Sequence, residues 1–400
     1  MRASQKVTNL DAATFSGAGD YAVSGLASSR QTIEAPAARA VVSDGIVARL
    51  TAIWEDMLRT TPIAPDQNYF DLGGDSILAV QLFVRIEQEF AIKLPLATLF
   101  AAPTIQELAQ ILRTQSTTSD WSPLVAIQTN GTRPVFFCMH AAGGTILIYR
   151  NLSKHLGSDQ PFYGLEARGL DGSCSPLLTI EEMADLYVQS IRKAQPKGPY
   201  FIGGYCMGGT VAFEVAQRLR AAGEEVALLA LFDTSDWSKI PAPSFWGKSY
   251  RAAERLVFHA ANFYRLDLNG KRKFFSEKLK VLRNRIPVWK GMLLTAFGNQ
   301  AVLRRSNSRV SSQIWKANDR ACINYVPAPY PGTITDFRPL KQYRMFNKPN
   351  AKWDRLAEQG QEVVVLPVYP AGMLLEPFVE HLAIALKKSI DKVMGQCETV

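Results

Sequence analysis

The stretch "GGYCMGGTVAFEVAQRL", residues 203–219, decides the fold. Its core, G-Y-C-M-G centred on Cys206, has the form G-x-S-x-G with cysteine in the serine position. Glycines two residues on either side give room to a strained turn between a strand and a helix. The pattern therefore predicts a strand, a sharp turn at Cys206 and a helix, and makes Cys206 a candidate nucleophile. The alternative is a buried structural cysteine, a common fate of free thiols.

Strands and helices alternate on both sides of this turn from Pro123 onward. The segment "TIEEMADLYVQSIRKA" (179–194) is amphipathic, with Thr179 predicted as its N-cap and Glu182 as the capping-box partner. Interleaved strands and helices predict a mostly parallel sheet with helices on both faces. The expected buried strands are "RPVFFCMH" (133–140), "PYFIGGYC" (199–206), "EVALLALFDTSD" (225–236) and "EVVVLPVYP" (362–370).

A different pattern fills residues 44–113, where apolar residues recur at helical spacing. This segment predicts a small all-α bundle of four helices. Residues 1–43 lack periodicity and are expected to form a flexible leader, and the polar residues 114–122 a linker. The apolar positions are Val47, Leu50, Ile53, Trp54, Met57 and Leu58, then Leu78, Leu82, Ile86 and Phe90, and finally "TIQELAQIL" (104–112).

Composition excludes several classes of protein. Hydrophobic residues make up 47% of the chain and charged residues 20%, as in ordinary globular proteins. We see neither an apolar run of the ~18 residues that span a bilayer nor a signal peptide, so we expect a cytoplasmic protein without membrane contact. Five cysteines without paired spacing indicate free thiols in a reducing compartment and no metal site.

The charge is unevenly distributed. Residues 239–309 contain 16 Lys and Arg against 3 Asp and Glu, a net charge of +13, whereas residues 44–113 carry 5 against 9, or −4. No nucleic-acid reader motif accompanies the basic segment, so we expect no nucleic-acid partner. The segment forms either a solvated basic face or a surface for an acidic protein.

The first functional motif is "NYFDLGGDSILAVQL" (68–82), with Ser76 at the start of an expected helix. A helix N-cap is the structural interpretation of this serine. The wider pattern, from the "IWEDML" helix to the closing helix, resembles peptidyl and acyl carrier domains. That resemblance implies that a phosphopantetheinyl transferase attaches 4′-phosphopantetheine covalently to Ser76.

A second resemblance covers residues 123–397. "HAAGG" (140–144), the turn at Cys206 and "ALLALFDTSD" follow one another as in the thioesterase domains of nonribosomal peptide and polyketide synthetases, of the α/β-hydrolase superfamily. The resemblance implies that Cys206 is the nucleophile, Asp233 the catalytic aspartate that orients the histidine, and the N–H groups of Met207 and Ala142 the oxyanion hole. It also assigns residues 237–330 to a helical lid.

The chain departs from this family at the catalytic histidine, because Pro370 occupies its expected place before "MLLEP" (373–377). None of the four histidines, His140, His155, His259 and His381, has a good claim to replace it.

A thiol needs less activation than an alcohol to act as a nucleophile. We predict that the helix N-terminus lowers the pKa of Cys206 toward neutrality. Thioester exchange then proceeds without histidine, whereas water needs a general base. Similar enzymes that shuttle aminoacyl groups use a cysteine here. We therefore expect an enzyme that transfers acyl groups between pantetheine arms, with carrier and adenylation modules as partners. The alternatives are a chain-releasing thioesterase, by hydrolysis or cyclisation, and a non-catalytic docking scaffold.

Overall fold

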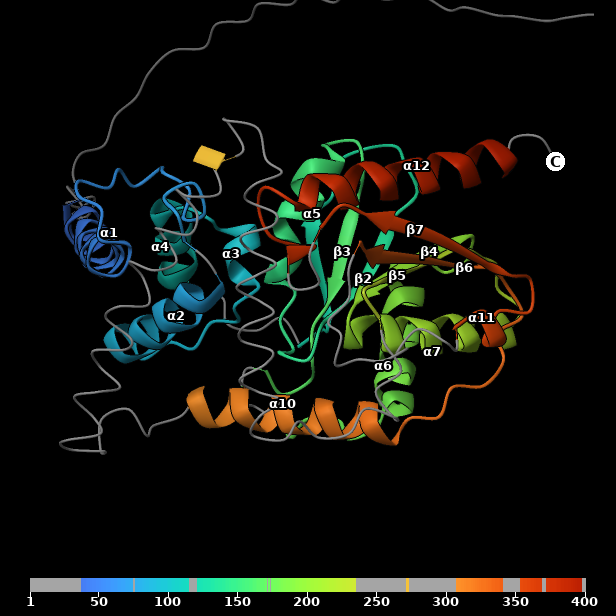
Figure 1. Cartoon of the computed structure of the whole chain (residues 1–400). Helices are drawn as coiled ribbons and strands as arrows, with labels where there is room; N and C mark the ends of the chain where they lie inside the picture. The colour runs from blue at the N-terminus through green and yellow to red at the C-terminus, as the bar shows by residue number, and fades with distance from the viewer. Residues whose placement is uncertain are drawn as a thin grey trace, which may run out of the picture. The chain divides into compact units, whose positions relative to one another are not determined.

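The computed structural model describes most of the chain (Figure 1). The described residues are 37–74, 76–114, 121–170, 172, 174–234, 271–272, 307–340, 353–368 and 372–397. Among them, no helix is both long enough and apolar enough to cross a bilayer. Most of the leader, of the linker and of the expected lid lies outside the described residues.

The N-terminal domain consists of helices around a small apolar core. Its elements are α1 (Ala37–Leu58), α2 (Ser76–Phe90), the single turn α3 (Thr98–Ala101) and α4 (Ile105–Thr114). Helix α1 begins seven residues before the expected boundary at 44. The predicted apolar stripes form the core, which includes Leu50, Trp54, Leu58, Leu82, Ile86, Leu99, Leu108 and Leu112.

The C-terminal domain is built on a seven-stranded sheet with the order β1-β3-β2-β4-β5-β6-β7. Strand β1 runs antiparallel to β3, and all other neighbours are parallel, so the predicted mostly parallel sheet is confirmed. The strands are β1 (Leu124–Gln128), β2 (Phe136–Met139), β3 (Phe162–Leu165), β4 (Tyr200–Tyr205), β5 (Val226–Phe232), β6 (Ile334–Pro339) and β7 (Gln361–Leu366).

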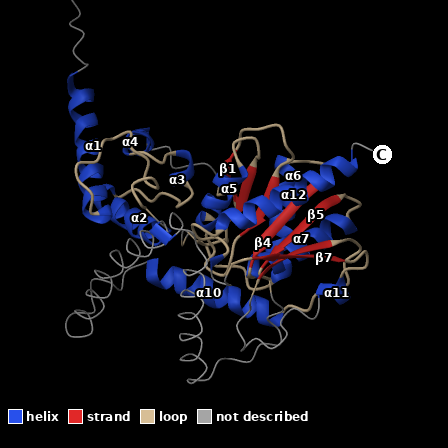
Figure 2. Ribbon diagram, turned by 45° about the horizontal axis from the view of Figure 1, so that its top comes forward, coloured by secondary structure: helices blue, strands red, loops and turns tan. Residues whose placement is uncertain are grey.

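Helices cover both faces of this sheet (Figure 2). On one face lie α5 (Arg150–Leu156), which follows the short 3-10 helix at Leu147–Tyr149, and α12 (Val379–Cys397). On the other lie α6 (Ile180–Ala194) and α7 (Met207–Ala221), with α10 (Asn307–Asn324) packed against α7. The short α11 (Trp353–Leu356) precedes β7.

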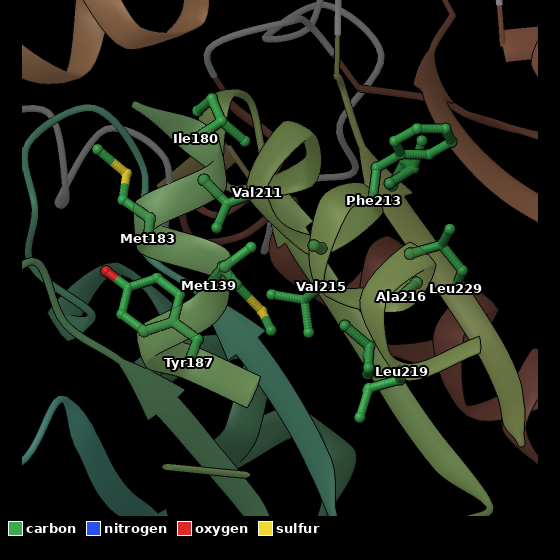
Figure 3. Close-up of a cluster of buried hydrophobic side chains, with 14 of the residues drawn as sticks. Met139, Ile180, Met183, Tyr187, Val211, Phe213, Val215, Ala216, Leu219 and Leu229 are labelled. Carbon is green, nitrogen blue, oxygen red and sulfur yellow. The ribbon is translucent and has the colours of Figure 1, made fainter. Parts of the chain in front are cut away.

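The apolar core beneath α6 and α7 fixes the position of the nucleophile helix. Figure 3 shows Met183 and Tyr187 of α6 beside Val211 of α7 and Met139 of β2. The predicted cap of α6 is confirmed, since the Thr179 hydroxyl accepts a hydrogen bond from the Glu182 N–H at 3.2 Å. The apolar core holds both helices against the central strands, and this packing fixes the position of the carboxyl end of β4.

Candidate active site

Cys206 lies at the junction of β4 and α7, where the sequence predicted the sharp turn. Its backbone has φ 57° and ψ −118°, a left-handed conformation that costs a non-glycine residue of the order of 1–3 kcal/mol and clusters at functional sites. Its N–H donates to the Phe232 carbonyl oxygen at 2.9 Å, which ties the turn to the neighbouring strand. This hydrogen bond stabilises the strained turn and holds the thiol at the carboxyl edge of the sheet.

The two glycines of the pattern are needed because the turn brings backbones into contact. A Cβ built on Gly204 would lie 2.2 Å from the carbonyl of Gly208, and one on Gly208 would lie 2.4 Å from the carbonyl oxygen of Met139. Neither contact can be relieved by moving a side chain. The glycine spacing is thus a packing requirement of the turn.

Asp233 follows the end of β5, the strand next to β4, just as Cys206 follows the end of β4. The parallel register pairs Tyr205 with Phe232, so Cys206 and Asp233 follow at the ends of two adjacent strands, which run ~4.8 Å apart. Asp233 also has a positive φ, of 45°, and its N–H donates to the Phe337 carbonyl oxygen at 2.9 Å. Two strained residues therefore lie side by side at one edge of the sheet.

The electrostatics of Cys206 differ from the sequence prediction. Burial, followed by the charge of Asp233, raises the pKa of the thiol to about 12. A hydrogen bond from the Met207 N–H lowers the pKa, and the charge of Asp319 on α10 raises it further. The predicted pKa near neutrality is therefore wrong, because desolvation outweighs the helix N-terminus, and the resting site holds a neutral thiol.

The pKa of Asp233 differs from that of an ordinary surface carboxylate. Burial, with a contribution from the charge of Asp336, raises its pKa from 3.8 to about 7. Asp336 is buried in β6, and its Oδ2 accepts hydrogen bonds from Arg338 Nε at 2.6 Å and Gln361 Nε2 at 2.9 Å. Asp233 can consequently gain or lose a proton near neutral pH, as an acid–base group does.

The loop 140–144 supplies the second expected oxyanion donor, Ala142. The Ala141 carbonyl oxygen accepts the Gly144 N–H at 2.8 Å and lies 2.8 Å from the Nδ1 of His140. A trans peptide is planar, so the Ala142 N–H points away from these partners. The direction of the expected donor is therefore fixed within the loop.

The described histidines do not hydrogen-bond to Cys206 or Asp233. His140 is fully buried, packs edge-on against Tyr187, and its pKa is lowered to about 4 by burial, which keeps it neutral. His155 is hydrogen-bonded to Glu376 at 2.8 Å, and His381 is exposed on α12. His259 and Pro370 lie outside the described residues.

Ser76 is the first residue of α2, although its side chain and Asp75 lie outside the described residues. The turn before it is tight, because Gly73 has φ 93° and a Cβ on Gly74 would lie 2.3 Å from the buried Tyr69 ring. A helix N-terminus favours a phosphate through its free N–H groups and its dipole. This position therefore fits a phosphorylated group attached to the Ser76 hydroxyl.

Each of the two domains described above matches a known family. Residues 134–317 match the model of the thioesterase domain, and residues 48–112 match that of the phosphopantetheine attachment site. The chain thus carries a match to a phosphopantetheine attachment site followed by a match to a thioesterase domain. The carrier family is one in which 4′-phosphopantetheine is attached covalently.

The similar proteins are much longer than this chain. Malpinin synthetase of Mortierella alpina is 41% identical over 196 residues, which are 48% of this chain and 2% of the synthetase. A dimodular nonribosomal peptide synthase of Bacillus subtilis is 40% identical over 184 residues, 46% of this chain and 8% of the synthase. A crystal structure of a four-domain nonribosomal peptide synthetase matches 91% of this chain and 27% of its own, with a TM-score of 0.53 and 23% identity, which shows a shared fold.

Two residues that support the turn at Cys206 and the loop 140–144 were not apparent from the sequence. The buried Tyr149 hydroxyl accepts the Tyr205 N–H at 2.9 Å and donates to the Met139 carbonyl oxygen at 2.6 Å, which links the ends of β4 and β2. Asn318 of α10 donates to the Ala142 carbonyl oxygen at 2.9 Å. Neither residue lies in a recognisable motif. The described residues contain no group of three or more His, Cys, Asp and Glu that is arranged to hold a metal ion.

Proposed function

We propose that this chain transfers acyl or aminoacyl groups between thiols in nonribosomal peptide or polyketide biosynthesis, through a thioester on Cys206. The observation that carries the proposal is the position of Cys206 and Asp233, which directly follow the paired strand ends Tyr205 and Phe232. No described histidine hydrogen-bonds to either residue. This arrangement favours chemistry in which both the donor and the acceptor are thiols.

Ser76 is the proposed attachment point of the chain's own carrier arm. Bound there, 4′-phosphopantetheine supplies the thiol on which an acyl group travels. The glycine turn before α2 leaves the serine at a helix N-terminus, which suits the phosphate of that arm. We propose a phosphopantetheinyl transferase and other carrier or adenylation modules as partners.

Asp233 is the proposed proton acceptor. General acid–base catalysis is most effective when the pKa of the catalytic group lies near the working pH. The pKa of Asp233, about 7, lies nearer to that of the Cys206 thiol, about 12, than to that of water at 15.7. The carboxylate is therefore better suited to accept a proton from sulfur than to activate water.

The step begins with a neutral thiol. The Cys206 proton moves to the Asp233 carboxylate while the sulfur attacks the carbonyl carbon of the donor thioester. Negative charge develops on the carbonyl oxygen, where the N–H groups of Met207 and Ala142 are the proposed donors. The carbon–sulfur bond of the donor then breaks, and the departing thiol takes the proton from Asp233. An acceptor thiol repeats these steps in reverse and frees Cys206.

Mass spectrometry of the full chain tests this function. Incubated with an aminoacyl thioester of N-acetylcysteamine, the protein should gain one acyl group on Cys206, at a rate that rises as Asp233 ionises near pH 7. Cys206→Ala should gain none, and Cys206→Ser should be far slower because a hydroxyl gives up its proton far less readily than a thiol does. Cys174→Ala is the matched control, since it removes a different free thiol that is also partly buried. Equal acylation of Cys206→Ala would refute the proposal.

A further inference from the structure

Helix α10 lies directly against the loop 140–144. A Cβ added at Gly144 would lie 2.8 Å from the Ile314 side chain, and one at Gly143 would lie 3.5 Å from Trp315 Nε1. At its other end the helix is tied to α7, because the Tyr325 hydroxyl donates to Glu214 Oε2 at 2.7 Å. The helix therefore contacts both segments from which the proposed oxyanion donors come.

Among the residues of α10 whose burial is described, 313–324, the buried stripe is apolar except at one position. Ile314, Ala317, Ala321 and Cys322 are buried, and in their midst Asn318 is only 1% exposed. Burying an amide costs free energy unless it is hydrogen-bonded. Its Nδ2 donates to the Ala142 carbonyl oxygen at 2.9 Å, which links two residues 176 positions apart. The amide thus has a specific partner in the oxyanion loop.

This hydrogen bond completes the fixing of Ala142. The peptide group before Ala142 is held within the loop by the partners of the Ala141 carbonyl. The peptide group after it contains the Ala142 carbonyl and the Gly143 N–H, and it is held by Asn318. Because each peptide group is planar, fixing both leaves Ala142 little freedom in φ or ψ.

We infer that Asn318 is a positioning residue of the thioesterase site, which acts through Ala142 to hold the oxyanion hole in its active geometry. The inference rests on the proposed function, since it needs an acyl transfer that passes through a tetrahedral intermediate. Asn318 itself does not touch the reacting atoms. Its loss should slow the step that builds negative charge on oxygen and leave the reactivity of the sulfur intact.

Two reactions of the same thiol separate these effects. Acylation by a thioester needs the oxyanion hole, whereas alkylation by iodoacetamide displaces iodide at a saturated carbon and does not. Removal of one oxyanion donor typically costs about 10²–10³-fold in rate, and a displaced donor should cost less. In Asn318→Leu, which keeps the branched shape without the donor, we expect acylation of Cys206 to slow about 10- to 100-fold and alkylation to stay within about twofold.

A second variant separates hydrogen bonding from packing. Asn318→Ala leaves space for a water molecule that can donate to the Ala142 carbonyl, so it should acylate faster than Asn318→Leu. A packing role predicts the reverse order, because alanine leaves the larger cavity. Lys316→Ala, at an exposed position of α10, is the matched control and should leave both reactions unchanged.

The outcomes are distinct. If folded Asn318→Leu acylates as fast as the wild type, or if acylation and alkylation slow together, the inference is wrong. The same holds if Asn318→Ala is the slower of the two variants. If the wild-type protein is never acylated, the proposed function fails, and the positioning role fails with it.

Discussion

Replacement of Asp233 by asparagine should stabilise the fold above neutral pH while it strongly slows acyl transfer. Burial and Asp336 raise the pKa of Asp233 from 3.8 to about 7, so the native state binds this proton more tightly than the unfolded chain does. Between pH 3.8 and pH 7, ionisation of Asp233 therefore lowers the stability of the wild type as the pH rises. At about 1.36 kcal/mol per pKa unit, the loss amounts to at most about 4 kcal/mol. Asparagine does not ionise in this pH range, so the variant does not lose this stability.

The assay is chemical denaturation of wild type and Asp233→Asn at pH 4.5 and pH 8. Other titrating groups cancel in the difference between the two proteins. We expect the variant to be more stable by only about 1 kcal/mol at pH 4.5, where the carboxyl of the unfolded chain has begun to ionise, and by about 2–4 kcal/mol at pH 8. Acyl transfer by the variant should fall by about 10²–10⁴-fold, the usual contribution of a general base. A stability difference that does not change with pH would refute the raised pKa, and full activity would refute the role of Asp233 as proton acceptor.

Three further predictions concern the carrier, the glycine turn and the basic segment. With coenzyme A and a phosphopantetheinyl transferase, the wild type should gain one arm by mass, whereas Ser76→Ala should gain none; equal modification would show that another residue is the acceptor. Gly208→Ala should lower the free energy of unfolding by about 1–3 kcal/mol or more in denaturant titrations, because its Cβ meets a backbone carbonyl of β2. If residues 239–309, which carry a net +13, recruit an acidic carrier, acyl transfer from that carrier should slow as salt is raised. Rates that stay constant with salt would support a merely solvated basic face.

The architecture of the thioesterase domain could be predicted because it depends on local patterns. Apolar runs separated by amphipathic helices indicated the parallel sheet, and the glycines around Cys206 indicated the strained turn that the structure contains. The start of a helix at Ser76 followed from the polar Gly-Gly turn before it. Helix α1 begins seven residues before the expected domain boundary at 44, and no cap or periodicity marks residue 37 in the sequence.

The electrostatics of the site could not be predicted in this way. The pKa of Cys206 depends on its burial and on the charges of Asp233 and Asp319, which reach the thiol from other strands and helices. The contacts of Tyr149 and Asn318 join residues 56 and 176 positions apart. Such contacts arise from tertiary packing, and a single sequence carries no local signal for them.

The fate of the acyl group on Cys206 tests the central claim most directly. The acyl-enzyme is formed with a small thioester, freed of excess donor, and divided between buffer and buffer that contains a separate holo-carrier with a free pantetheine thiol. Intact-protein mass spectrometry then follows Cys206 over time. A site built to exchange thiols predicts an adduct that persists in buffer and moves rapidly to the carrier. Loss to free acid at one rate, with or without the carrier, would contradict the transfer function and indicate a thioesterase that releases its product to water.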